Sequence, residues 1–185
     1  AVIFSEQKIK EIAPQTSADL LEKTGEIFVQ KSQLGGGSPM IRGFSANRIL
    51  LTLDGVRLNN IIYRSGNLHN IIGIDPNILE GVEVLFGPAS VIYGSDALGG
   101  AINFKIKDPT FNLNKTVFFN SQKIQYNSSS NSKHYSLNFG FSSKKIGTIT
   151  SFSFNSFQNL KSGKNRNKYY EDFGYRDEYV VRDYI

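Results

Sequence analysis

Six side chains suited to ligand binding lie close together in one part of the chain. Guanidinium groups bind anions through paired hydrogen bonds and stack on flat aromatic groups. The segment from Asn59 to Gly73 mixes amides, arginine, tyrosine and histidine without a helical or strand period, which is typical of an exposed loop. We expect this region to bind an anionic or aromatic ligand, although each residue could also be an ordinary exposed loop residue. The six are Arg57, Asn59, Tyr63, Arg64, Asn67 and His69.

Two further charged residues, Arg42 and Glu83, lie within otherwise apolar predicted strands. A charge removed from water is costly unless it is paired or hydrogen-bonded. We therefore expect both side chains to have partners wherever they are buried.

The chain lacks the residue sets that carry catalysis or hold a metal. It has no cysteine, two histidines and no GxSxG string, and the glycines at 35–37 are not followed by the Lys-Ser/Thr ending of a phosphate-binding loop. We predict that the protein is not an enzyme and that it holds no cofactor and no metal.

The composition changes near Asp108. Residues 1–107 contain 10 Lys+Arg and 10 Asp+Glu, whereas residues 108–185 contain 11 and 6, so the net charge of +5 belongs to the second part. The first part holds 13 of the 17 glycines, and the second holds 16 of the 23 Phe and Tyr residues. Because the basic residues are scattered and do not line one helical face, we predict no nucleic-acid binding.

The first part is predicted to be a small α+β domain, a short mixed sheet with short helices. Thr16 and Ser17 precede an apolar-periodic stretch, and Ser17 with Asp19 can cap a helix that ends by Gly25. Asp54-Gly55 is a strong turn signal between two strands. Pro76 can open a second short helix. Strands are predicted at 26–32, 40–44, 48–53, 81–87 and 101–107, and positive φ or close backbone approach is predicted at Gly43, Gly55, Gly87, Gly94, Gly99 and Gly100.

The second part is predicted to form longer antiparallel strands at 116–126, 134–142 and 148–157. In the middle segment Tyr135, Leu137, Phe139 and Phe141 alternate with polar residues, so that one face is apolar and the other polar. A soluble sheet with one wet face is the commoner source of such alternation. Strands of a transmembrane barrel explain the uncovered, phenylalanine-rich face better, since soluble proteins avoid exposed apolar faces and open edges.

Two strings then point to a family. IRGFSANRILLTLDGVRLNN (41–60) and GVEVLFGPASVIYGSDALGGAINFKIK (81–107), in this order and spacing, resemble the plug signature of TonB-dependent outer-membrane receptors. TSADLLEKTGEIFVQ (16–30) resembles the first plug helix and strand of that family. The sequence from Gln33 to Asn70 is most similar to those of the haem and siderophore receptors of the family, and vitamin B12 receptors are the next most similar.

The resemblance implies a plug domain over 1–107 and the start of a transmembrane β-barrel over 108–185. The latter has room for about three strands and the beginning of an extracellular loop, so we expect a truncated barrel. The resemblance also implies a place in the bacterial outer membrane and energy-coupled uptake of a scarce nutrient such as haem or a ferric siderophore, with the plug gating the barrel. The implied partners are the inner-membrane TonB complex, outer-membrane lipid and a surface lipoprotein.

The resemblance further implies roles for single residues. Arg42 matches an arginine that ties the plug to acidic residues of the barrel wall, and Glu83 is expected at the same contact. A second arginine is expected in the VLFGP string, but Phe86 stands there. His69 could bind haem iron, although the plug histidine of haem receptors falls nearer Asn67. The alternative function is a surface-binding or assembly component that keeps the receptor scaffold without transporting.

Overall fold

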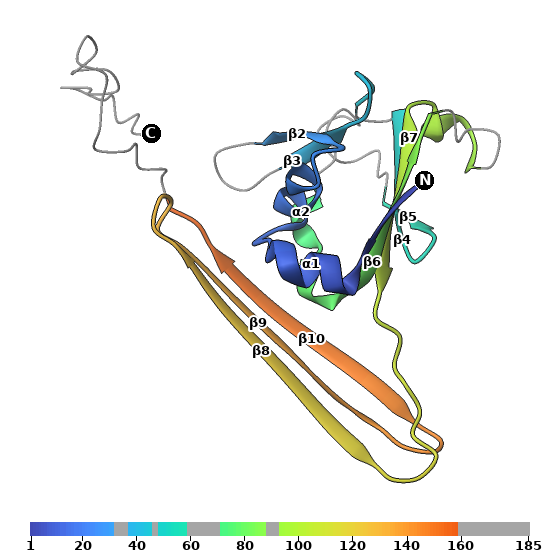
Figure 1. The fold of residues 1–185 in the computed structure, drawn as a ribbon, viewed down its shortest axis with the longest axis vertical. Coiled ribbons are helices and arrows are strands. Elements are labelled where there is room, and N and C mark those ends of the chain that lie inside the picture. Colours follow the sequence, from blue (N-terminus) through green and yellow to red (C-terminus); the bar gives the residue numbers. More distant parts are fainter. Residues whose placement is uncertain (32–36, 46–47, 59–70, 88–92, 159–185) are drawn as a thin grey trace, which may run out of the picture.

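The computed structural model describes residues 1–31, 37–45, 48–58, 71–87 and 93–158. Within these ranges a mixed sheet with short helices is followed by three antiparallel strands, as Figure 1 shows. The predicted fold class is therefore confirmed, and the described strands form no closed barrel. The division of the chain at residue 108 stays a prediction.

No helix among the described residues is long and apolar enough to cross a membrane.

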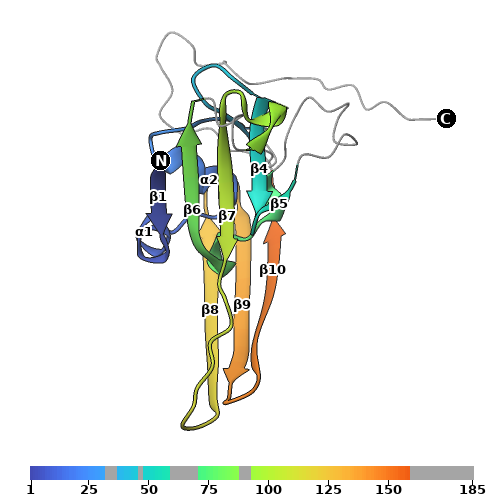
Figure 2. The ribbon, with the colours of Figure 1, turned by 90° about the vertical axis from the view of Figure 1, so that its right-hand side faces the viewer.

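The first part is built on a five-stranded sheet, which Figure 2 shows face-on. The central strand β7 pairs in parallel with β4 on one side and antiparallel with β6 on the other, and the remaining neighbours are antiparallel. In spatial order the strands are β1 (Val2–Ser5), β6 (Leu79–Phe86), β7 (Gly100–Ile106), β4 (Ile49–Leu53) and β5 (Val56–Arg57).

Helices cover one face of this sheet (Figure 1). Helix α1 (Glu6–Ile12) and helix α2 (Ser17–Lys23) lie there with the hairpin of β2 (Phe28–Lys31) and β3 (Gly37–Met40). They enclose one apolar core, in which Leu20, Leu21, Val82, Ile102 and Phe104 are fully buried. Short 3-10 turns complete the fold: η3 (Ile71–Gly73), η4 (Pro76–Ile78) and η5 (Ser95–Ala97).

The start of α2 is fixed by a capping box, in which Thr16 is the cap residue and not Ser17, to which the sequence prediction assigned the cap. The Thr16 hydroxyl accepts from the backbone N–H of Asp19 at 3.1 Å, and the Asp19 carboxylate accepts from the backbone N–H of Thr16 at 3.1 Å. These two bonds satisfy donors that a bare helix end leaves unpaired.

Replacing Thr16 with alanine should therefore lower the free energy of unfolding of this part by about 1 kcal/mol. Hydrogen exchange of the α2 amides measures the change, and Thr16→Ser, which keeps the hydroxyl, should restore most of the loss. Unchanged exchange in Thr16→Ala would contradict the capping role.

The structure corrects the sequence prediction at one strand. Strand β3 ends at Met40, whereas the predicted strand runs from 40 to 44. Ile41 and Phe44 close a tight turn through two backbone hydrogen bonds of 2.9 and 2.8 Å, and Arg42 takes a positive φ of 48°. Arg42 thus projects from a turn and not from a strand.

Two N-terminal elements escaped the sequence prediction. Strand β1 and helix α1 are short, so neither shows a usable period, and β1 exists through its pairing with β6. One local signal was present: the hydroxyl of Ser5 accepts from the backbone N–H of Lys8 and caps α1.

The predicted glycine roles are confirmed. Gly99 shows the clearest case of close approach, because an added Cβ would lie 2.3 Å from Cβ of Phe44. The remaining five, Gly43, Gly55, Gly87, Gly94 and Gly100, have positive φ.

The second part is an antiparallel sheet with a polar and an apolar face, as the alternation predicts. Its order is β10 (Gly147–Ser156), β9 (Ser132–Ser142) and β8 (Val117–Asn127). Phe118 and Phe154 on one face are 79% and 57% exposed, whereas His134 and Ser136 on the other are 1% exposed. The polar face is therefore the one that lies against the first part.

Candidate functional site

The buried polar face of β9 meets the η4 turn of the first part. The hydroxyl of Ser136 donates to Oδ2 of Asp75 at 2.9 Å, while Oδ1 of Asp75 accepts from the side-chain amide of Asn77 at 2.6 Å. The same Asn77 amide lies 3.0 Å from Nε2 of His134. One carboxylate and one amide thus hold two neighbouring inward residues of β9.

His134 extends this network to the third strand. Its Nδ1 lies 2.5 Å from Oδ1 of Asn155 on β10. An amide oxygen only accepts, so Nδ1 carries the hydrogen, and Nε2 then accepts from Asn77. The ring of His134 therefore bridges β10 and η4.

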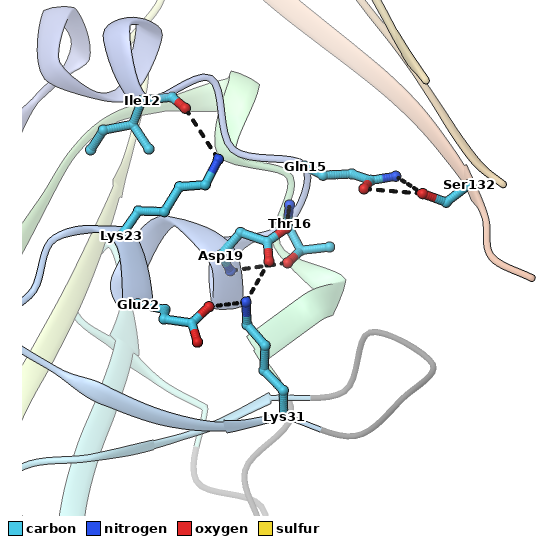
Figure 3. Close-up of polar contacts among 8 residues, drawn as sticks. All are labelled: Ile12, Gln15, Thr16, Asp19, Glu22, Lys23, Lys31 and Ser132. Atoms are coloured by element: carbon cyan, nitrogen blue, oxygen red, sulfur yellow. Dashed lines mark hydrogen bonds and ion pairs between the residues drawn. The ribbon is translucent and has the colours of Figure 1, made fainter. Parts of the chain in front are cut away.

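A second set of contacts joins the corner between α1 and α2 to the sheet. The Gln15 amide donates to the hydroxyl of Ser132 at 2.9 Å, and that hydroxyl lies 3.2 Å from the Gln15 amide oxygen (Figure 3). Nearby, the side-chain amide of Gln125 on β8 donates to the backbone oxygen of Ala13 at 2.9 Å. The corner between α1 and α2 thus meets the sheet through hydrogen bonds between polar groups.

Gln15 adjoins an ion-pair cluster shown in Figure 3. The Lys31 ammonium on β2 donates to Oδ1 of Asp19 at 2.7 Å and pairs with Glu22. Burial would lower the pKa of Lys31, but the hydrogen bonds that its ammonium donates to the two carboxylates outweigh burial and raise this pKa. Because Asp19 also caps α2, the β2–β3 hairpin is tied to the corner that contacts Ser132.

Of the six predicted ligand residues, the structure describes Arg57. Its Nη1 pairs with Oδ2 of Asp96 at 3.0 Å, and its Nη2 donates to the backbone oxygen of Tyr93 at 2.5 Å. This guanidinium joins the β4–β5 hairpin to the turn at η5. The other five, Asn59, Tyr63, Arg64, Asn67 and His69, lie outside the described residues, so the ligand site stays a prediction.

The two residues predicted to contact a barrel wall are both exposed. The guanidinium carbon of Arg42 lies 5.9 Å from the ring centroid of Phe86, within the range of a cation–π contact. Phe86, which stands where a second arginine was expected, thus contacts the guanidinium group of Arg42. Glu83 lies on β6 between Ile3 and Asn103 in the strand register. Their contact with a wall stays a prediction.

Glu83 and Arg57 share one polar row across the five-stranded sheet. Neighbouring strands align Glu83 with Asn103, Asn103 with Thr52, and Thr52 with Arg57. The hydroxyl of Thr52 donates to the side-chain oxygen of Asn103 at 2.7 Å. Because side chains alternate along a strand, this row faces away from the core that contains Val82.

The interface residues Gln15, Asp75 and Asn77 were missed by sequence reasoning. A partial signal existed in the alternating polar face around His134, but the sequence does not say what that face contacts. Within the described ranges no cluster of three or more His, Cys, Asp or Glu could hold a metal ion.

Comparison with known proteins agrees with this geometry. Residues 1–101 match the model of the family TonB-dependent Receptor Plug Domain. The chain is 39% identical over 105 residues to the vitamin B12 transporter BtuB of Vibrio vulnificus (strain CMCP6), covering 55% of this chain and 16% of that protein. It is 33% identical over 94 residues to the hemin receptor of Yersinia pestis, covering 50% and 13%.

A solved structure extends the likeness beyond the matched segment. The siderophore receptor PirA from Pseudomonas aeruginosa is similar with a TM-score of 0.58 and 25% identity, covering 84% of this chain and 27% of that one. The chain spans about one sixth or less of the length of the two curated relatives. The names of these three relatives describe one transporter and two receptors.

Proposed function

Because the chain belongs to the TonB-dependent receptor plug-domain family, whose members are outer-membrane proteins, we propose that it serves energy-coupled nutrient uptake. In this proposal residues 1–107 form a plug and the strands β8, β9 and β10 form part of the wall around it. The inner-membrane TonB complex supplies the force, since an outer membrane has no nucleotide supply. Lipid covers the aromatic outward face of the wall, and a surface lipoprotein is a further partner.

The polar interface between plug and wall carries the proposal that the plug gates the barrel. The apolar core lies wholly within residues 4–104, while Asp75, Asn77 and Gln15 meet the wall through hydrogen bonds. Water can replace such bonds at a small net cost, whereas separating apolar surfaces costs free energy in proportion to their area. A plug attached in this way can move along the wall without losing its own fold.

The proposed cargo is anionic and aromatic or metal-bearing, such as haem or a ferric siderophore. The names of the relatives include a vitamin B12 transporter, a hemin receptor and a siderophore receptor. Arg64 of the predicted loop carries a guanidinium group that suits the carboxylates of haem or an anionic chelate.

Uptake by cells that carry the intact polypeptide tests this function. Host cells lacking their own receptors should accumulate labelled haem or a ferric siderophore when the intact polypeptide is present, and accumulation should fall to background when the TonB complex is disabled. Surface binding should persist in both cases. Binding without any accumulation would favour the alternative, a surface-binding component that does not transport.

A further inference from the structure

A hollow of about 200 Å³ lies between α1, η4 and the wall strands β8 and β9. A single water needs only roughly 10–15 Å³ of such space, so the hollow can hold a small molecule or part of one. Its charged lining consists of Lys10 and Glu6 from α1, Lys107 after β7, and Lys123 from β8. The side chain of Asn138 on β9 completes it, and we call these five residues the lysine pocket.

Positive charge exceeds negative charge in the lysine pocket. Glu6 shares one carboxylate oxygen between Lys10 at 2.8 Å and Lys107 at 3.0 Å. The hydrogen bond from Lys10 is the main reason why the pKa of Glu6 is lowered, so its charge is kept at neutral pH. Three ammonium groups against this one carboxylate leave an excess of two positive charges.

Among the described residues, Lys123 is the ammonium group of the lysine pocket that lacks a close partner. It is half-buried, and in the described part of the chain it makes no hydrogen bond and no ion pair within 4.0 Å. The carboxylate of Asp75 acts on it through space, but the Asp75 oxygens already accept from Asn77 and Ser136. The lysine pocket therefore keeps an excess of positive charge even when Asp75 is counted.

Asn138 contributes a buried hydrogen-bond acceptor that has no donor among the described residues. The residue is 9% exposed, and the acceptor is its Oδ1. Its Nδ2 lies 3.5 Å from the backbone oxygen of Asn77, which also accepts from the Lys107 ammonium at 2.9 Å. The amide is therefore held beside Lys107 with a buried acceptor left open.

We propose that the lysine pocket binds an anionic group that also carries an O–H donor, as a hydroxycarboxylate or a hydrogen phosphate does. The anionic oxygens accept from Lys123 and from the lysines paired with Glu6, and the O–H donates to Oδ1 of Asn138. This inference rests on the proposed function and deepens it, because a cargo with such a group would meet the lysine pocket between plug and wall.

Amine reactivity in the intact polypeptide, purified in detergent, tests the lysine pocket without transport. Acetylation of each lysine is followed by mass spectrometry without ligand and with each of three saturating ligands. These are citrate, a hydroxycarboxylate; tricarballylate, which has the same carboxylates and no hydroxyl; and inorganic phosphate. Citrate should slow acetylation of Lys10, Lys107 and Lys123 and leave Lys144 and Lys145 unchanged. The last two are exposed in the turn between β9 and β10 and serve as internal controls.

Variants then separate binding from structure. Lys123→Gln should weaken citrate binding about tenfold, the factor typical of one charge-assisted hydrogen bond, whereas Lys144→Gln should not change it. Asn138→Ala should weaken citrate binding about tenfold and leave tricarballylate binding unchanged. A purely structural role of Asn138 would weaken both equally.

The acetylation experiment has four outcomes that bear on the proposal. Protection by phosphate and not by citrate assigns the lysine pocket to a phosphate group, and protection by neither overturns the proposal. Equal protection of Lys144 and Lys145 also overturns it, because the effect is then nonspecific screening. If citrate slows acetylation of the three lysines but no TonB-dependent uptake is found, the proposed function is wrong and the lysine-pocket proposal still holds.

Discussion

Linking Gln15 to Ser132 covalently should abolish uptake while leaving cargo binding unchanged. These two side chains already touch across the interface at 2.9 Å, so cysteines at both positions lie within reach of a short bis-maleimide. These 185 residues contain no cysteine, so within them the reagent can join only the introduced thiols. If the plug must move along the wall, a linkage at this point should reduce uptake to the background measured without the TonB complex.

Matched controls isolate the linkage from the substitutions. Gln15→Cys and Ser132→Cys as single variants, treated with the same reagent, should retain uptake. A pair within the sheet, Lys133→Cys with Ser156→Cys, joins register partners of β9 and β10 and leaves the plug free. Full uptake by a receptor whose Gln15–Ser132 linkage is verified by mass would show that this contact persists during transport, and plug movement at this site would be excluded.

Truncating Phe104 should destabilise the plug more than any surface change. This side chain is 0% exposed and lies on β7 between Val82 of β6 and Leu53 of β4. Phe104→Ala removes buried apolar surface and leaves a cavity, so the free energy of unfolding of the plug should fall by about 3–5 kcal/mol. Hydrogen exchange of the β6 and β7 amides in the intact polypeptide measures this loss.

Phe28→Ala provides the matched control, because Phe28 is 68% exposed on β2. Its effect should stay within about 0.5 kcal/mol. A loss of less than about 1 kcal/mol for Phe104→Ala would mean that the sheet is not the centre of plug stability. The wall strands should keep their protection in both variants, since no residue of β8, β9 or β10 belongs to the described core.

Much of the fold could be predicted because its signals are local. The capped start of α2 and the turn at Asp54-Gly55 are each set by adjacent residues, and the structure shows both. The two-residue period of 134–142 likewise predicted which face of β9 is polar. Where the local signal was ambiguous the prediction failed, as at Arg42, which lies in a turn held by the bonds between Ile41 and Phe44.

The candidate site was less predictable than the fold. Arg57 was proposed as a ligand residue from its type and its neighbours in sequence, yet its guanidinium pairs with Asp96, 39 positions away. Ser136 and Asp75, which join the wall to the plug, are 61 positions apart. No motif marks such partners, because a serine or an asparagine is an unremarkable residue until a second segment is placed against it.

By itself the sequence determined the family, the class of fold, the capped helix, the turn at Asp54-Gly55 and the strands with one polar and one apolar face. These follow from residues a few positions apart, whose backbone preferences and side-chain periods act before the chain has folded. The tertiary structure alone decided that β1 pairs with β6, that the polar face of β9 is buried against η4, and that three lysines surround one hollow. Those arrangements depend on distant segments meeting in space, and a linear pattern of residue types does not encode which of them meet.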